Sequence, residues 1–222
     1  RAKETTELFK KNNPDREIPV QAEISPDACF LLRLLRSRNE KSFIDSYEKF
    51  KKDFEVEDLS KQAEESDLNL KEYCTLLLYQ AIKFDCEVVV EYLIKDGVDV
   101  TRKPHVFSQR HIPAIIACSR GNHRILKALL AANHRLEISE GQKNLLHIAT
   151  EHYGMIPSKH MTDDYKKCFK LALKYCKEVN QQDEEGCTPL HYAARYRCDE
   201  SVLELMRNGK GSKFILKIKI NL

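Results

Sequence analysis

The sequence predicts an all-α protein, a solenoid of helix-turn-helix units joined by β-hairpin or loop fingers. One layout recurs: an alanine on a short helix is followed sixteen residues later by glycine or asparagine at the end of a second helix, as at Ala81 and Gly97, and at Ala117 and Asn133. The chain has only 7 Gly and 7 Pro, which leaves little room for long flexible linkers. Its 42% hydrophobic and 32% charged residues are typical of a helical protein with a well-solvated surface.

Residues 1–25 show no apolar period, and we expect them to be disordered or to be the edge of a longer chain. The sequence begins at Arg1 rather than at a methionine, which favours a fragment. Residues 53–69 are rich in charged side chains and predict a connector, either irregular or partly helical.

Between these two segments, residues 26–52 predict a first, diverged helix pair. Pro26 suits the start of a helix, where its missing N–H costs nothing. Phe43, Ile44, Tyr47 and Phe50 are expected on one face of the second helix.

Residues 70–209 hold about four repeats. The intervals between successive marker alanines are 36, 32 and 44 residues, and the markers are Ala81, Ala117, Ala149 and Ala193. The longest interval contains an insertion near residues 154–165, which we expect to form a loop that leaves the repeats intact.

The last stretch, residues 210–222, reads KGSKFILKIKINL and alternates basic and apolar residues unlike any earlier part of the chain. It begins where another finger should follow Gly209. We therefore expect this atypical tail to be an artefact, either read-through from an intron or a wrong gene-model end.

The stretch TPLHYAARY, residues 188–196, has the clearest motif in the chain. Before it, Asp183 and Gly186 are placed to build a tight turn, because glycine adopts positive φ without steric cost. This arrangement resembles the ankyrin repeat, which is about 33 residues long. One departure is Arg197, where that family prefers a glycine between its two helices.

The other repeats match less closely. Ile112-Pro113 and Asn144-Leu145 stand where the motif has Thr-Pro, and only the third repeat keeps the Leu-His pair. The resemblance assigns structural roles to Ala81, Gly97, Ala117, Gly121, Leu146, His147, Ala149, Thr188, Pro189, Leu190, His191, Ala193, Ala194 and Gly209. Of these, Gly209 is expected to form a left-handed helix cap.

The resemblance also implies a role for the two motif histidines. In ankyrin repeats the threonine hydroxyl caps the first helix and bonds to the histidine ring. His191 and His147 are therefore expected to be structural residues rather than catalytic bases.

No motif in the sequence predicts an enzyme or a bound cofactor. Nucleophile elbows, phosphate-binding glycine loops and paired carboxylates at helical spacing are absent from the sequence. The formal net charge of +3 is too small to predict a nucleic-acid partner. His152, His160, Met161, Asp163 and Asp164 crowd the insertion, but their irregular spacing predicts a solvated loop rather than a metal site.

The 8 cysteines are scattered without a CxxC pair, which favours reduced thiols over a disulfide framework. We expect Cys118 to be a buried, inert core residue, and Cys86, Cys187 and Cys198 to be exposed in turns. Residues 101–111 carry three basic residues and two histidines at a fingertip; a solvated loop is favoured there over a contact with a polyanion or a lipid headgroup.

The order of these features resembles the cytoplasmic N-terminal region of the ankyrin-type transient receptor potential channel family. The similar features are the diverged first pair, the acidic connector, the VVVEYLIKDGVDVTRKP segment and the long insertion. The resemblance implies a scaffold and sensor in a tetrameric, calcium-permeable cation channel of the plasma membrane, involved in thermal or mechanical nociception. Its partners would be proteins or neighbouring subunits, and the chain would reach the membrane only through segments missing from this sequence.

Two other classes remain open. A soluble ankyrin-repeat adaptor would bind a cytosolic protein, and its gene would stop after a polar capping repeat. A channel gene would continue into six apolar segments. An ankyrin-fused enzyme is disfavoured because no catalytic motif is present in this sequence.

Overall fold

The computed structural model describes most of the chain and divides it into two compact units, residues 1–113 (unit 1) and 114–222 (unit 2). The residues described are 26–58, 70–101, 112–132, 139–140, 143–155 and 162–209. The predicted N-terminal segment 1–25, the tail 210–222 and nearly all of the basic segment 101–111 lie outside them.

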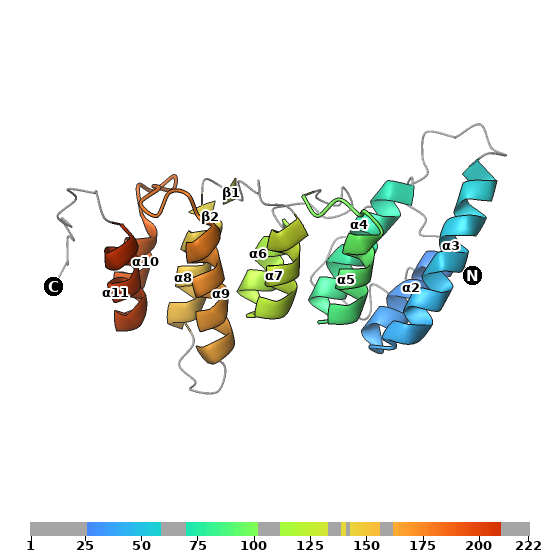
Figure 1. Ribbon diagram of the computed structural model, residues 1–222, viewed down its shortest axis with the longest axis horizontal. Helices are drawn as coiled ribbons and strands as arrows, with labels where there is room; N and C mark the ends of the chain where they lie inside the picture. The colour runs from blue at the N-terminus through green and yellow to red at the C-terminus, as the bar shows by residue number, and fades with distance from the viewer. Residues whose placement is uncertain are drawn as a thin grey trace. The chain divides into compact units, whose positions relative to one another are not determined.

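Unit 1 consists of two helix pairs in its described part (Figure 1). Helix α2 packs on α3 and α4, and α3 packs on α5. The helices are α2 (Pro26–Arg36), α3 (Glu40–Asp58), α4 (Leu70–Lys83) and α5 (Glu87–Lys95). Their core contains the fully buried side chains of Leu31, Leu35, Phe43, Tyr47, Leu77, Leu78, Ile82, Val89, Val90 and Leu93.

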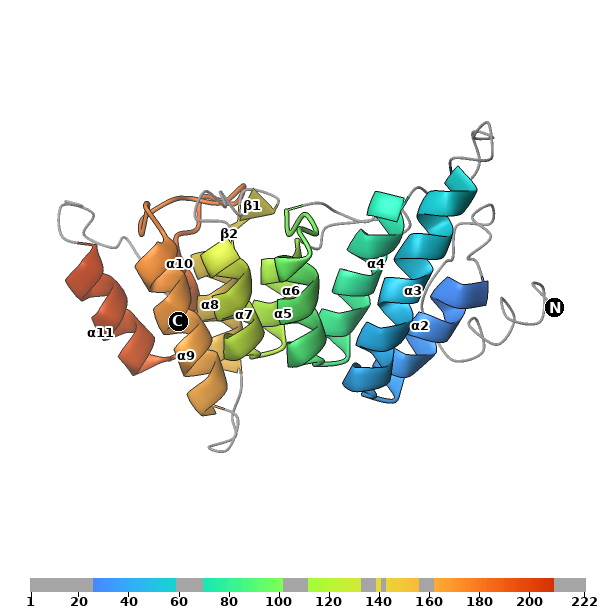
Figure 2. The ribbon, with the colours of Figure 1, turned by 45° about the vertical axis from the view of Figure 1, so that its right-hand side comes forward.

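Unit 2 contains three further pairs, which stand side by side in Figure 2. Helix α8 packs on α9 and α10, α10 packs on α11, and α7 packs on α9. The helices are α6 (Pro113–Ser119), α7 (His123–Ala132), α8 (Leu145–Met155), α9 (Thr162–Tyr175), α10 (Pro189–Arg195) and α11 (Asp199–Asn208). Strands β1 (Ser139–Glu140) and β2 (Lys143–Asn144) form an antiparallel finger in which Ser139 pairs with Asn144. The predicted all-α class is confirmed.

Two predicted boundaries differ from the observed helices. Helix α3 continues to Asp58, into the segment predicted as connector, because residues 53–58 contain no glycine or proline to end it. At the predicted insertion, α8 continues to Met155 and α9 begins at Thr162, so only residues 156–161 lie outside the description.

The turns between paired helices share one backbone motif in the described residues. In each turn, one residue adopts positive φ, and the next N–H bonds back to a carbonyl in the last turn of the first helix, the Schellman arrangement. The positive-φ residues are Arg38, Asp85, Gly121 and Arg197, with φ values of 55°, 64°, 72° and 54°. The accepting carbonyls include those of three marker alanines, Ala81, Ala117 and Ala193, at 2.9, 2.9 and 3.1 Å. The repeated alanine in the sequence therefore marks a repeated helix terminus.

Gly209 is not the left-handed cap that the sequence predicts. Its φ is −79°, and its N–H donates to the Leu205 carbonyl at 2.8 Å as in an ordinary helix. A Cβ at this position would lie 3.1 Å from that oxygen and 3.3 Å from Asn180 Oδ1. A close approach between chain segments therefore selects this glycine, whereas Gly97, with φ of 87°, is the left-handed one.

The expectation of exposed turn cysteines is wrong for Cys86, which is 1% exposed. It occupies the N-cap of α5, where its Sγ donates to the Leu35 carbonyl at 3.4 Å, and burial raises the pKa of its thiol to about 11. Cys187 and Cys198 are half-buried. Cys118 is fully buried, and a hydrogen bond with Cys168 together with burial raises the pKa of its thiol.

Candidate functional site

The candidate site is the finger of unit 2 that precedes α10, residues 180–188. The Asp183 carboxylate organises this finger: its Oδ1 accepts the N–H groups of Glu185 and Cys187 at 3.0 and 2.9 Å. Gly186 completes the turn with a φ of 73°. The predicted tight turn is therefore built by an aspartate that pairs with its own backbone.

The other oxygen of Asp183 ties the finger to α10. The buried Tyr192 hydroxyl donates to Asp183 Oδ2 at 2.7 Å. Burial opposes ionisation of Asp183, but the Tyr192 hydroxyl and the two backbone N–H groups hold the pKa of its carboxyl below the usual value. Burial and the bond to Asp183 raise the pKa of Tyr192 to about 12, so this hydrogen bond persists at neutral pH.

Helix α10 begins with the predicted cap. Thr188 and His191 form a capping box: the Thr188 N–H donates to His191 Nδ1 at 3.1 Å, and Thr188 Oγ1 lies 2.9 Å from the same nitrogen. Pro189 occupies the first helical turn, where its lost N–H costs nothing.

Helix α8 uses the same frame with asparagine in place of threonine. Asn144 Oδ1 accepts the His147 N–H at 3.0 Å, and the Asn144 N–H lies 3.1 Å from His147 Nδ1. The other ring nitrogen, Nε2, lies 3.0 Å from the Cys187 carbonyl in the following finger. His147 is fully buried, and burial lowers the pKa of its ring although the Cys187 carbonyl opposes this shift. The neutral ring thus joins α8 to the next repeat.

Further contacts around His147 were not predicted from the sequence. Asn144 Nδ2 donates to Gln181 Oε1 at 3.0 Å, and the Tyr192 ring meets the His147 ring edge-on with centroids 5.8 Å apart. Lys143 Nζ lies 4.7 Å from the centre of the Tyr192 ring. In the sequence, these contacts were indicated only by the position of Lys143 and Asn144 directly before a Leu-Leu-His motif.

A second group of contacts joins the helices of unit 2. The Tyr153 hydroxyl donates to Glu200 Oε2 at 2.8 Å, and Lys166 Nζ lies 2.5 Å from Glu200 Oε1. These two partners lower the pKa of the Glu200 carboxyl. The Tyr165 hydroxyl donates to the Ser119 carbonyl at 3.2 Å. Side chains of α8, α9 and α11 are therefore linked through Glu200.

The predicted motif residues do not form one site, since they are spread over several repeats in both units. Ala81 and Gly97 lie in unit 1 and the rest in unit 2. The buried ones are Ala81, Ala117, Gly121, Leu146, His147, Ala149, Pro189 and Ala193. The half-buried ones are Thr188, Leu190, His191, Ala194 and Gly209, and Gly97 is exposed.

The residues weighed as metal ligands are not brought together by the described structure. His152 stacks on the Tyr165 ring, and Asp164 pairs with His123 Nδ1 at 3.1 Å. His160 and Met161 lie outside the described residues. Within those residues, no three His, Cys, Asp or Glu side chains are grouped to hold a metal ion.

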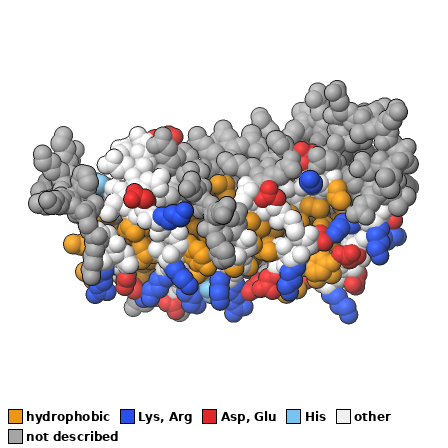
Figure 3. All heavy atoms as spheres, turned by 45° about the horizontal axis from the view of Figure 1, so that its top comes forward, with side chains coloured by type: hydrophobic (Ala, Val, Ile, Leu, Met, Phe, Trp, Pro, Cys, Tyr) orange, Lys and Arg blue, Asp and Glu red, His pale blue; other side chains and the backbone are white. Residues whose placement is uncertain are grey.

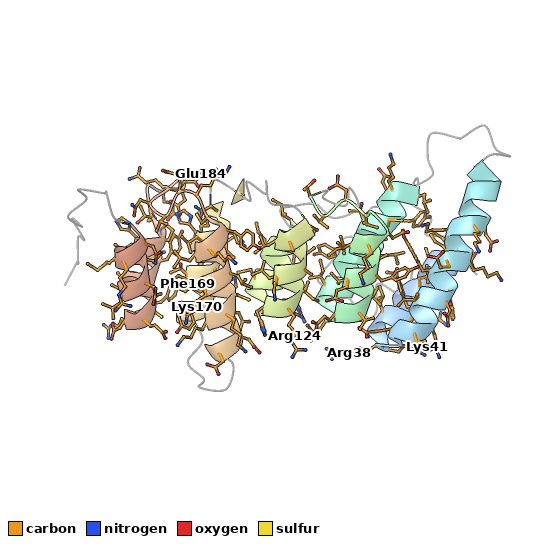
Figure 4. The ribbon with its side chains drawn as sticks, viewed as in Figure 1. Arg38, Lys41, Arg124, Phe169, Lys170 and Glu184 are labelled. Carbon is orange, nitrogen blue, oxygen red and sulfur yellow. The ribbon has the colours of Figure 1, made fainter. Side chains whose placement is uncertain are left out.

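The surface of unit 2 combines acidic and basic groups. Glu184 projects at the tip of the finger, whereas Lys170 lies beside α9 (Figure 4). Lysine and arginine side chains alternate with acidic ones along the visible face of the molecule (Figure 3). The finger with its network of hydrogen bonds thus offers a fixed backbone that displays variable side chains, which suits the binding of proteins.

Residues 185–213 match the ankyrin repeat. The matched segment contains the end of the finger and both helices α10 and α11. The matched segment is therefore an ankyrin repeat, as its TPLH motif predicts, and the all-α fold of helix pairs fits a repeat solenoid. Ankyrin repeats serve as protein-interaction scaffolds.

Similar proteins include channels. The chain is 29% identical to Transient receptor potential cation channel subfamily A member 1 of Homo sapiens over 133 residues, which cover 59% of this chain and 11% of that protein. Identity to the protein of the same name in Drosophila melanogaster is 27% over 134 residues, 60% of this chain and 11% of the relative.

Inversin of Canis lupus familiaris is also similar, with 34% identity over 140 residues, which cover 61% of this chain and 11% of inversin. The chain thus spans 11% of the length of each of these three relatives. The predicted resemblance of this ankyrin-repeat region to ankyrin-type channels is confirmed.

None of the helices in the described part of the chain has both the length and the apolar character needed to cross a bilayer.

Proposed function

We propose that this ankyrin-repeat region is the cytoplasmic scaffold and sensor of a transient receptor potential cation channel subunit similar to the insect painless channel. The similarity to two subfamily A channels over about 60% of the chain supports the channel assignment. The observation that carries the sensor role is the buried His147 ring, which joins α8 to the Cys187 carbonyl of the next finger.

This contact would pass a displacement from one repeat to the next. A load on the finger reaches α8 through His147 and reaches α10 through the Tyr192–Asp183 hydrogen bond. Glu200 of α11 adds a second path, through Tyr153 of α8 and Lys166 of α9. Since repeats contact only their neighbours, such links determine how stiffly motion is transmitted.

On this proposal, four subunits form a calcium-permeable channel in the plasma membrane that responds to heat or mechanical stimuli. The ankyrin region lies on the cytoplasmic side and contacts protein partners or neighbouring subunits. It contributes no catalytic group and no cofactor.

The first experiment is to sequence the full-length transcript beyond the codon for Asn208. Continuation into six apolar segments of about 20 residues supports the channel. A stop after the ankyrin region in every transcript overturns it.

The second experiment tests the sensor role in the full-length protein by calcium imaging during heating and pressure. Glu200→Gln weakens the bonds from Lys166 and Tyr153, so we expect a shifted activation threshold. Glu204→Gln is the matched control, because in the described structure Glu204 forms its ion pair with the exposed Arg207, one turn away on the same helix. Equal thresholds in wild type and both variants would contradict transmission through Glu200.

The second candidate is an ankyrin-repeat adaptor that binds a cytosolic protein. This adaptor candidate is supported by the 34% identity with inversin, which exceeds the identity with the two channels. The transcript experiment separates the two candidates directly.

A further inference from the structure

The second helices α7 and α9 of unit 2 carry exposed lysines that have no carboxylate partner in the described structure. Lys170 and Lys174 lie one turn apart on α9, and Lys127 lies on α7, which packs on α9. Among the described residues, the ion pairs of α9 lysines are formed by Lys166 and Lys167 instead. We call Lys127, Lys170 and Lys174 the basic strip. Like charges one turn apart on a helix repel each other, so the strip favours an anionic partner.

The basic strip is narrow, because acidic side chains border it. Helices α6 and α7 contain no aspartate or glutamate, but Asp163 and Asp164 occupy the first turn of α9. On the other side of α9, α11 carries Glu200 and Glu204, and Glu200 is held by Lys166 of α9. A flat anionic bilayer would bring its headgroups against these carboxylates as well, and like charges repel. The strip therefore suits an acidic partner no wider than one loop.

The finger of unit 2 is an acidic element of this width. Glu184 and Glu185 are exposed at its tip, and neither forms an ion pair in the described structure. Their backbone is fixed by Asp183, which accepts the N–H groups of Glu185 and Cys187 and the hydroxyl of Tyr192. A loop that is ordered before it binds loses less conformational entropy on binding. The fingertip thus presents two carboxylates in a preformed position.

The finger and the strip lie at different places on one molecule. Glu184 lies at the fingertip, whereas Lys170 lies well below it beside α9 (Figure 4). Two complementary patches that cannot meet within one molecule can join it to its copies in a head-to-tail contact. Such a contact closes into a ring or continues as an open chain, depending on the rotation between copies.

We propose that the acidic finger of one copy, through Glu184 and Glu185, binds the basic strip of a second copy of this chain. Exposed ion pairs are individually weak, so the contact is well populated only where copies are concentrated or held near one another, as in a tetramer. The proposal deepens the proposed function by naming a partner of the ankyrin region, and it rests on that function only in requiring that several copies meet.

The test is sedimentation of the full chain at concentrations up to about 1 mM, where weak contacts become populated. The average mass should rise with concentration at about 0.1 M salt and return to that of the monomer at about 1 M salt, because the Debye length falls from about 10 Å to about 3 Å. The double variants K170E/K174E and E184K/E185K should each associate at least about tenfold more weakly, because like charges then face each other.

Mixing these two double variants tests whether the finger meets the strip. The unchanged acidic finger of one variant fits the unchanged strip of the other, and the reversed finger fits the reversed strip. The mixture should therefore associate as wild type does, although each variant alone remains monomeric. K49E/K52E is the matched control, since it makes the same change of net charge at exposed lysines of α3 and should associate as wild type. Circular dichroism of each variant shows whether it folds.

A wild-type chain that stays monomeric at every concentration and at low salt would overturn the proposal. It would leave the channel assignment intact, because the transcript experiment tests that assignment separately. A mixture of folded double variants that stays monomeric would also overturn it, since the finger and the strip then do not meet. Binding of a monomeric wild type, but not of K170E/K174E, to vesicles of phosphatidylcholine and phosphatidylserine would show that the strip binds a lipid surface instead.

Discussion

In unit 2, helices α8 and α10 begin at a finger and are fixed there by a histidine, whereas in unit 1 the corresponding helix α4 begins earlier and has tyrosine at that position. Helix α4 begins at Leu70, six residues before Leu76, which takes the frame position of Thr188. Tyr79 stands at the histidine position and is buried.

The two units nevertheless use one type of link between neighbouring repeats. In unit 1 the buried Tyr47 hydroxyl donates to Asp96 Oδ2 at 2.8 Å, and Lys51 Nζ lies 2.6 Å from Asp96 Oδ1. In unit 2, Tyr153 and Lys166 hold Glu200 in the same way. The comparison shows that a repeat can lose its recognisable cap when a longer helix and an apolar run such as Leu76–Leu78 replace it, while the tyrosine–carboxylate link is kept.

The largest expected change in stability comes from replacing glycines, which serve different purposes in the two units. A Cβ on Gly154 of unit 2 would lie 2.5 Å from Tyr196 Cβ, so Gly154→Ala should reduce the free energy of unfolding by about 2–3 kcal/mol through overpacking. Gly97 of unit 1 has φ of 87° and no atom within 4 Å of an added Cβ. Gly97→Ala should therefore cost only about 1 kcal/mol through backbone strain. Urea denaturation of both variants measures the difference, and equal losses would contradict the distinction.

The next effect compares the two histidines within unit 2. His147→Ala leaves the buried Asn144 N–H and the half-buried Cys187 carbonyl without their ring partners and should cost about 2–3 kcal/mol, because unsatisfied buried groups are expensive. His191→Ala removes only the contacts at the cap of α10, so we expect a loss of about 1 kcal/mol. Thermal denaturation followed by circular dichroism ranks the two, and a larger loss for His191→Ala would refute this assignment.

A smaller effect of opposite sign is expected at the turn of α10–α11. Arg197 has φ of 54°, a conformation that favours glycine. Arg197→Gly should therefore stabilise the protein by about 0.5–1 kcal/mol. Arg38→Gly in unit 1 relieves the same strain but also removes an ion pair with Asp85 at 3.6 Å, so its gain should be smaller. Differential scanning calorimetry would show the two gains, and a lower melting temperature for Arg197→Gly would contradict the prediction.

The smallest effect is the pH dependence that histidine gives to unit 2. Burial lowers the folded-state pKa of His147 below its unfolded value of 6.5, so the fold favours the neutral ring. The stabilisation is full above pH 6.5 and declines as the pH falls below it, because protonation then favours the unfolded chain. No described residue of unit 1 is a histidine. Hydrogen exchange at pH 7.5 and 5.5, corrected for intrinsic rates, should show a larger loss of protection in α8 than in α4, and His147→Gln should reduce that loss.

The positions of the helix pairs were predictable because their signals are local. The marker alanines Ala81, Ala117 and Ala193 recur since each stands at a fixed place before a Schellman turn. Arg197 was recognised as the position where glycine is preferred, and the positive φ found there gives the physical reason.

The predictions that were wrong concern residues whose surroundings come from elements distant in the sequence. Cys86 lies in a turn, but the carbonyl end of α2, some fifty residues earlier, covers it. Gly209 has the right offset for a left-handed cap, but its φ is −79°, and an added Cβ would lie 3.3 Å from Oδ1 of Asn180, which precedes the finger of its repeat.

The sequence by itself determined the helix pairs, their turns and the capped helix that begins at Thr188, since backbone sterics and capping act within a few residues. Only the tertiary structure decided which of the two equivalent histidines is buried. Leu146-His147 and Leu190-His191 are the same motif in the sequence. The His147 ring is fully buried because the next finger lies over it and supplies a carbonyl, whereas the described structure covers His191 only in part. Burial is a property of the neighbour that packs on a residue, and the residue's own motif does not encode it.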